Sequence, residues 1–154
     1  MGIFDFLKRP GTYKKFYYDN GQISEEGYFK NDICSIFSSR LKIRDLNQGK
    51  QPYTKEHDKN AGFLSYNGEI YNFYELKKKF NKIKSQCDTE LIYEIFRSTD
   101  NKIEKYLNDL EGQFAISYFD PKRKELYLAR DKLGEKPLYW SKHKNSIIFS
   151  SEIK

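Results

Sequence analysis

Apolar and polar residues alternate along several short stretches of the chain, and each stretch predicts a strand. The alternation over residues 33–44 predicts a long strand, in which Arg40 lies on the more polar face together with Ile36. Residues 61–66 are mainly apolar and predict a buried strand that ends in a tight turn at Asn67-Gly68, because this pair is a strong turn signal. Four more strand-like runs, separated by turn residues, cover residues 114–119, 125–129, 138–141 and 146–150.

Apolar residues at helical spacing lie between the early and the late strands. Asn72 and Glu75 have the spacing of a capping box and predict a helix from Asn72 to about Ile83. Asp88 is a candidate N-cap for a second helix, and a short third helix covers residues 103–107. Strands at both ends with helices between them predict an α+β fold of two stacked antiparallel sheets flanked by helices.

The first 31 residues differ from the rest of the chain. Two strand-like runs, 13–18 and 22–29, flank Asp19-Asn20-Gly21, which is the pattern of a β-hairpin. We therefore divide the chain into an N-terminal segment, 1–31, and a main domain, 32–154. The hairpin, over residues 12–30, resembles one unit of the MORN-like repeats. The sequence does not decide between that interpretation and a hairpin that pairs with the edge of the main domain.

Composition narrows the classes of function. The chain has 154 residues and a net charge of +6, with lysines that are scattered rather than clustered, so no nucleic-acid partner is expected. No stretch approaches the ~18 apolar residues of a membrane span and no signal peptide is evident, so we expect a cytoplasmic protein without a membrane partner. The two cysteines, Cys34 and Cys87, lack the spacing of metal ligands, and we expect neither a metal nor a cofactor.

A series of ordered motifs gives the chain a family resemblance. The central motif is Asn67-Gly68-Glu69-Ile70-Tyr71-Asn72, and the others are at residues 40–45, 51–52, 88–90, 110–115, 129–134, 136–139 and 151–154. Together they resemble the class II glutamine amidotransferase domain of asparagine synthetase over about residues 36–154. The resemblance implies an N-terminal-nucleophile hydrolase-like fold that hydrolyses glutamine to glutamate and ammonia.

The resemblance also implies roles for five residues. Arg40 would bind the α-carboxylate of glutamine, and Glu69 and Asp88 would hold its α-ammonium group. Asn67 and Gly68 would form the oxyanion hole. These residue types suit the task, because a bound amino acid needs a cation for its carboxylate and anions for its amine.

The nucleophile that the resemblance implies is missing. Members of the family begin Met-Cys-Gly-Ile, whereas this chain begins Met1-Gly2-Ile3. Cys34 is six residues before Arg40 on the same predicted strand, roughly 20 Å away and too far for one glutamine to bridge. Cys87 stands where the family usually has Ser.

Three interpretations of function follow from the missing nucleophile. The first is a pseudoenzyme that binds glutamine weakly without hydrolysing it. The second is an active glutaminase whose nucleophile comes from processing or from a partner chain. The third is a structural remnant that acts as an interaction module. A synthetase or another protein is the expected partner.

Overall fold

The protein is an α+β fold with antiparallel sheets and flanking helices, as the sequence predicted. The structure is a computed structural model that describes residues 16–17, 23–30, 35–41, 51–55, 61–80, 83, 85–98, 103–143 and 146–153. The strands are β1 (Phe16–Tyr17), β2 (Ile23–Lys30), β3 (Ser35–Leu41), β4 (Phe63–Ile70), β5 (Gly112–Asp120), β6 (Glu125–Arg130), β7 (Tyr139–His143) and β8 (Ser146–Ser150). The helices are α2 (Phe73–Lys77), α3 (Asp88–Ser98) and α4 (Ile103–Asn108).

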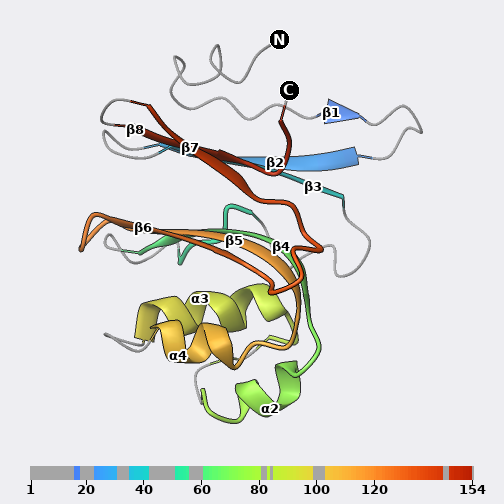
Figure 1. The fold of residues 1–154 in the computed structure, drawn as a ribbon. Coiled ribbons are helices and arrows are strands. Elements are labelled where there is room, and N and C mark those ends of the chain that lie inside the picture. The colour runs from blue at the N-terminus through green and yellow to red at the C-terminus, as the bar shows by residue number, and fades with distance from the viewer. Residues whose placement is uncertain are drawn as a thin grey trace.

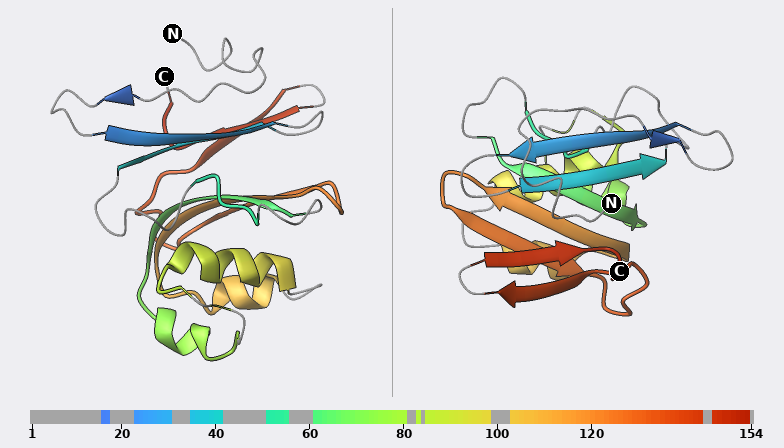
Figure 2. Two further views of the ribbon diagram at one scale, coloured as in Figure 1. Left: turned by 180° about the vertical axis from the view of Figure 1, so that it is seen from behind. Right: turned by 90° about the horizontal axis from the view of Figure 1, so that it is seen from above.

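The elements are stacked in three layers (Figure 1). One layer holds β2 and β3 together with the β7–β8 pair, the middle layer is the sheet β4-β5-β6, and the third contains the helices. Figure 2 shows the same order from behind, and from above it shows the two parts of the first layer apart from each other, with strands of the middle sheet visible between them. In the part of the chain that the structure describes, no helix is long and apolar enough to cross a membrane.

The N-terminal hairpin is joined to the main domain through β3. Strand β2 pairs antiparallel with β3 from Ser24 opposite Leu41 to Lys30 opposite Ser35, and the two-residue strand β1 pairs with β2. This pairing matches the alternative in which the hairpin extends the edge of the main domain. Ile36 on β3 is 1% exposed, so the face predicted to be the more polar one includes a fully buried residue.

The central strand of the middle layer is β5, which pairs with β4 on one side and β6 on the other. Phe114, Ile116 and Tyr118 belong to the main hydrophobic core, while Ser117 and Phe119, at alternate positions, are also buried. Successive side chains of a strand point to opposite faces, so β5 is covered on both sides. This burial is what a sheet between two layers requires.

Helix α3 packs on the sheet through a stripe of apolar residues at helical spacing. Its buried residues include Leu91, Ile92, Ile95 and Phe96, each 0% exposed, and the Phe96 ring stacks on Tyr118 with 4.8 Å between ring centroids. Burying each such side chain contributes about 1.5–3 kcal/mol. The packed face therefore fixes where the first residue of α3, Asp88, meets the sheet.

Three local predictions around residues 67–83 are wrong. Asn67-Gly68 is not a turn, because β4 continues to Ile70 and is paired with β5 along its whole length. Asn72 is at the N-cap of α2 but makes no side-chain capping bond. Its amide instead donates to the Asp109 carbonyl at 2.8 Å and accepts from the Glu111 N–H at 3.1 Å. Helix α2 itself ends at Lys77 rather than near Ile83.

Candidate functional site

The candidate site is at the C-terminal end of β4. Tyr66 and Ile70 are buried, whereas Asn67 and Glu69 are exposed. Alternation along the strand therefore places the Asn67 amide and the Glu69 carboxylate on the face opposite the helices. Neither side chain forms a hydrogen bond or an ion pair with another described residue, so both are available to a ligand.

Gly68 is required by the close approach of β4 and β5. Its φ is +153°, and a Cβ at this position would lie 2.1 Å from the Gln113 carbonyl oxygen. Gly112 on β5 has φ +154°, and its Cβ would lie 2.1 Å from the Glu69 carbonyl oxygen. Any larger residue would push the strands apart, because the atoms in the way belong to the backbone. The two glycines fix the backbone geometry of the segment that carries Asn67 and Glu69.

Asp88 is brought to the end of β4 by α3. Its Oδ2 accepts hydrogen bonds from the Tyr66 hydroxyl at 2.9 Å and from the Ile70 N–H at 3.2 Å. No described residue donates to Oδ1. One carboxylate oxygen therefore anchors the start of α3 to the strand, and the other has no donor in the described part of the chain.

The outer edge of β4 is held by residues 51–55. Tyr53 and Leu64 exchange two backbone hydrogen bonds, of 2.7 and 2.9 Å. The Gln51 side chain then binds both backbone groups of Tyr66, accepting from its N–H at 2.8 Å and donating to its carbonyl at 2.5 Å. Gln51 therefore takes the place of a neighbouring strand directly before Asn67. Sequence reasoning missed this role, although Gln51-Pro52 is one of the motifs that carry the resemblance.

Arg40 is placed only by its backbone. It lies in β3 opposite Glu25, and β3 contacts β4 from the adjoining layer. The Arg40 side chain lies outside the described part of the structure. The structure therefore brings Asp88 to β4, the strand that carries Asn67, Gly68 and Glu69. It also places β3, the strand of Arg40, in contact with β4.

The structure describes one of the two cysteines, Cys87. Cys87 directly precedes Asp88, is partly exposed and is a free thiol, and its backbone N–H donates to Ser85 Oγ at 3.2 Å. Cys34 lies outside the described residues. No group of three or more His, Cys, Asp or Glu side chains that could hold a metal ion occurs among the residues that the structure describes.

The motif at residues 129–134 forms a loop centred on a buried carboxylate. Asp131 is 6% exposed and accepts hydrogen bonds from the N–H groups of Glu135, Lys136 and Phe114, at 2.9, 3.1 and 3.2 Å. Burial by itself raises the pKa of Asp131, but the backbone donors Lys136, Glu135 and Phe114 outweigh it and lower that pKa to about 2. The loop is thus tied to β5 by a carboxylate that is ionised at neutral pH. Sequence reasoning treated the motif only as part of the resemblance.

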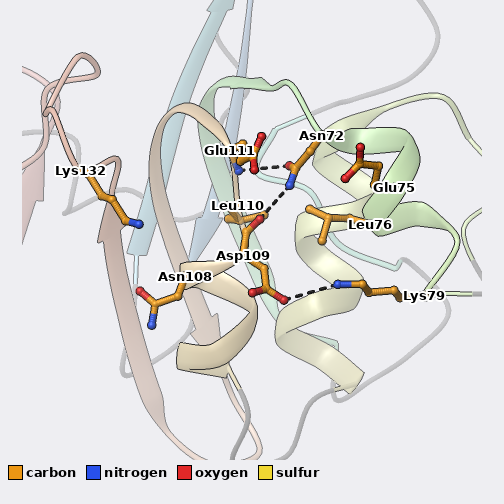
Figure 3. Close-up of a pocket in the computed structure, with 9 residues that line it drawn as sticks. All are labelled: Asn72, Glu75, Leu76, Lys79, Asn108, Asp109, Leu110, Glu111 and Lys132. Atoms are coloured by element: carbon orange, nitrogen blue, oxygen red, sulfur yellow. Dashed lines mark hydrogen bonds and ion pairs between the residues drawn. The ribbon is translucent and has the colours of Figure 1, made fainter.

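A shallow pocket of about 390 Å³ lies near the site but contains none of its residues (Figure 3). It is lined by Asn72, Glu75, Leu76, Lys79, Asn108, Asp109, Leu110, Glu111 and Lys132. Several of its polar groups are already paired, since Asn72 bonds the backbone on either side of Leu110 and Lys79 lies 3.5 Å from the Asp109 carboxylate. We therefore place the candidate site at the end of β4, where polar groups are left without described partners.

Comparison with known proteins gives the family. The family model described as "Glutamine amidotransferase domain" matches residues 38–154, which is most of the chain. The chain belongs to this family. Among curated relatives, it is 36% identical over 132 residues to asparagine synthetase [glutamine-hydrolyzing] 2 of Bacillus subtilis, covering 84% of this chain and 17% of that protein.

Other relatives of the amidotransferase domain have similar names. The chain is 37% identical over 140 residues to a putative asparagine synthetase of Methanocaldococcus jannaschii, covering 82% of this chain and 27% of that protein. It is 40% identical over 120 residues to a probable asparagine synthetase of Acanthamoeba polyphaga mimivirus, covering 75% and 21%. The amidotransferase domain thus spans between about a sixth and a quarter of the length of these relatives.

Solved structures agree on the fold. Glutamine phosphoribosylpyrophosphate amidotransferase from B. subtilis, complexed with ADP and GMP, superposes with a TM-score of 0.61 at 23% identity, covering 76% of this chain and 27% of that chain. The allosteric regulatory enzyme of purine biosynthesis gives a TM-score of 0.53 at 22% identity, covering 66% and 23%. The fold is therefore the N-terminal-nucleophile hydrolase-like fold that the resemblance implied.

Proposed function

We propose that this amidotransferase domain binds glutamine at the end of β4. Asp88 and Glu69 would hold the α-ammonium group, Arg40 the α-carboxylate, and Asn67 with Gly68 the oxygen of the side-chain amide. The observation that carries the proposal is the state of Asp88, whose Oδ2 is held by two protein donors while Oδ1 has none among the described residues. A carboxylate fixed in this way is preorganised to accept one more charged donor.

The neighbouring strand supplies what the rest of a glutamine molecule needs. Asn67 and Glu69 are exposed on one face of β4, and β3, which carries Arg40, contacts that strand. An amide donor beside a backbone N–H is the arrangement that stabilises an oxyanion. The charged and amide residue types on these two strands therefore suit a free amino acid with a terminal amide.

We further propose that this chain alone does not hydrolyse glutamine. Cys34 precedes Arg40 by six residues in the sequence, and six residues of extended chain span roughly 20 Å, which is too far for one glutamine to bridge. Cys87 is close to Asp88, but its position corresponds to Ser in the family that the sequence resembles. Neither thiol is therefore proposed as the nucleophile.

Glutamine titration followed by NMR tests the binding proposal. We expect a dissociation constant no better than roughly millimolar, or about 4 kcal/mol of binding free energy, because a site open to water weakens charge pairs. Arg40→Ala should abolish the binding, since the substrate carboxylate loses its cation. Lys105→Ala removes an equal charge from the exposed surface of α4 and is the matched control. Binding that survives Arg40→Ala would refute the assigned site.

An ammonia-release assay tests the absence of hydrolysis. Purified chain with glutamine should release no more ammonia than a protein-free control. Ammonia release that Cys34→Ala abolishes would show that the distance argument is wrong and would favour the active-glutaminase alternative. The same assay with a synthetase-type protein added tests for a nucleophile supplied by a partner.

We also propose a role for the N-terminal segment and a class of partner. The family match begins at residue 38, and β2 pairs onto β3, so we propose that residues 1–31 are an addition that extends the sheet of the domain at 32–154. The curated relatives are named asparagine synthetases and are several times longer. We propose a synthetase-type protein as the partner for that reason. The MORN-like interpretation of the hairpin stays a prediction.

A further inference from the structure

Tyr66 connects the two halves of the proposed site. Its backbone directly precedes Asn67, and its hydroxyl donates to Asp88 at 2.9 Å. The backbone is itself held on the open side of β4, because the Gln51 amide binds both its N–H and its carbonyl. One residue therefore determines where the Asn67 amide and the Asp88 carboxylate lie relative to each other.

The hydrogen bond from Tyr66 to Asp88 persists at every physiological pH. The Tyr66 side chain is buried, at 6% exposed, within the core under β4. Burial raises the pKa of the phenol, and the negative charge of Asp88 and its hydrogen bond raise that pKa further, so the hydroxyl stays a donor at every physiological pH. A hydrogen bond from a neutral donor to a carboxylate is stronger than one between neutral groups.

The geometry also decides which carboxylate oxygen a ligand can reach. Tyr66 and the Ile70 N–H both occupy Oδ2 of Asp88. With Oδ2 occupied, rotation of the carboxylate is restricted and Oδ1 is held in one direction. Without the Tyr66 hydroxyl, only the longer bond of 3.2 Å from Ile70 would remain to orient the group.

We infer that Tyr66 is a positioning residue that gives the site its selectivity for ligands with an α-ammonium group, by holding Asp88 through its hydroxyl and Asn67 through its backbone. This inference rests on the proposed function, since it concerns the same glutamine site. Tyr66 itself does not touch the substrate. Its contribution is therefore measurable as a difference between ligands that have the amine and ligands that lack it.

The test compares two ligands on two variants. Tyr66→Phe removes the hydroxyl and keeps the buried ring. Tyr118→Phe is the matched control, because Tyr118 is 1% exposed on the neighbouring strand and no described contact links its hydroxyl to Asp88. The ligands are glutamine and 4-carbamoylbutyrate, which is glutamine without its α-amine. NMR titration measures both dissociation constants at one pH.

We expect Tyr66→Phe to weaken glutamine binding about tenfold and to leave the binding of 4-carbamoylbutyrate unchanged. Tyr118→Phe should change neither. An equal loss for both ligands would show that Tyr66 only supports the fold, and unchanged glutamine binding in Tyr66→Phe would also overturn the inference.

A measurement without ligand separates this inference from the proposed function. Should the wild-type chain fail to bind glutamine, the proposed function fails, and hydrogen exchange of the Ile70 amide then decides whether Tyr66 positions Asp88. That amide donates to the same carboxylate oxygen. We expect faster exchange in Tyr66→Phe than in Tyr118→Phe. Equal exchange in the two variants would overturn the positioning role.

Discussion

Asp131 and Asp88 are two aspartates that join separate parts of the fold, and they differ in how many of their acceptor positions the protein uses. In Asp131, Oδ1 accepts from Glu135 and Oδ2 from Phe114 and Lys136. In Asp88, the described donors all reach Oδ2. The β6–β7 loop thus uses both oxygens of its aspartate, whereas at the end of β4 the described residues use only one.

Glu94 in α3 is a third acidic residue whose two carboxylate oxygens can be compared in the same way. It is 1% exposed, with Oε1 bound to Lys55 and Oε2 bound to Arg97 and Ser98. Burial raises the pKa of Glu94, but the hydrogen bonds and charges of Lys55 and Arg97 outweigh it and lower that pKa overall. Glu94 therefore resembles Asp131, because both oxygens of its carboxylate accept bonds from the protein. The two carboxylates whose oxygens are both used thus hold separate segments together, whereas the Asp88 Oδ1 has no donor among the described residues and is the atom that we propose for the ligand.

The largest effect should come from Asp131→Ala. This substitution leaves three backbone N–H groups without their acceptor, and that of Phe114 is buried between strands. We expect the thermal midpoint to fall further than in any of the substitutions below. The thermal midpoint of Asp131→Asn, which keeps one acceptor oxygen, should fall less. A midpoint for Asp131→Ala within experimental error of that for Asp88→Asn would break the comparison.

Measuring stability at several pH values tests the same role of Asp131. The folded-state pKa of Asp131, about 2, lies below its ordinary value of 3.8, so the ionised group stabilises the fold at neutral pH. That contribution is complete above about pH 5 and is lost as the pH falls toward about 2. The difference in stability between wild type and Asp131→Asn, from urea unfolding at several pH values, should therefore be constant above about pH 5 and shrink below it.

Glu94→Ala should have the next largest effect. It removes the buried carboxylate that Lys55 and Arg97, each about one-third exposed, both contact. We expect a loss of about 3 kcal/mol in the free energy of unfolding, measured by urea denaturation. Glu75→Ala, at an exposed position of α2, is the control and should change stability by less than about 0.5 kcal/mol. Similar losses in both variants would place Glu94 among ordinary surface charges.

Asp88→Asn should separate binding from stability. An amide oxygen can still accept from Tyr66 and Ile70, so we expect a loss of only about 1 kcal/mol in the free energy of unfolding. Glutamine binding should weaken more than tenfold, because the ligand ammonium group no longer meets a negative charge. NMR titration and urea denaturation of the same sample measure both. Retained binding with a large loss of stability would make Asp88 a structural residue like Asp131.

Cys87→Ser should have the smallest effect. The thiol is partly exposed, and the described hydrogen bond at this position comes from the backbone N–H rather than from sulfur. We expect a change in stability below about 0.5 kcal/mol and no change in glutamine affinity. Ammonia release that is present in the wild type and lost in this variant would show that Cys87 is a nucleophile.

The sequence by itself determined the family, the fold class and most of the elements. The helix predicted near Asp88 begins at that residue, and the run 146–150 is β8, because apolar spacing is a local signal. Asp88 is the first residue of α3 rather than its N-cap, and its carboxylate accepts from Tyr66 and Ile70 on β4. Motif order was enough to identify the amidotransferase family and to name Asn67, Gly68, Glu69, Asp88 and Arg40 as candidates. Their roles remain predictions.

Tertiary structure alone decided what those residues contact. Asn67-Gly68 has a strong turn preference, yet it lies in a strand because β5 pairs with every residue of β4. Asn72 could cap its helix, but its amide binds the backbone of residues 109 and 111 instead. Tyr66 and Gln51 are 15 residues apart, and neither their contact nor the bond from the Tyr66 hydroxyl to Asp88 has a local signal. Hydrogen bonds between distant segments depend on how the layers pack, so spacing along the chain cannot show which oxygen of Asp88 the described donors reach.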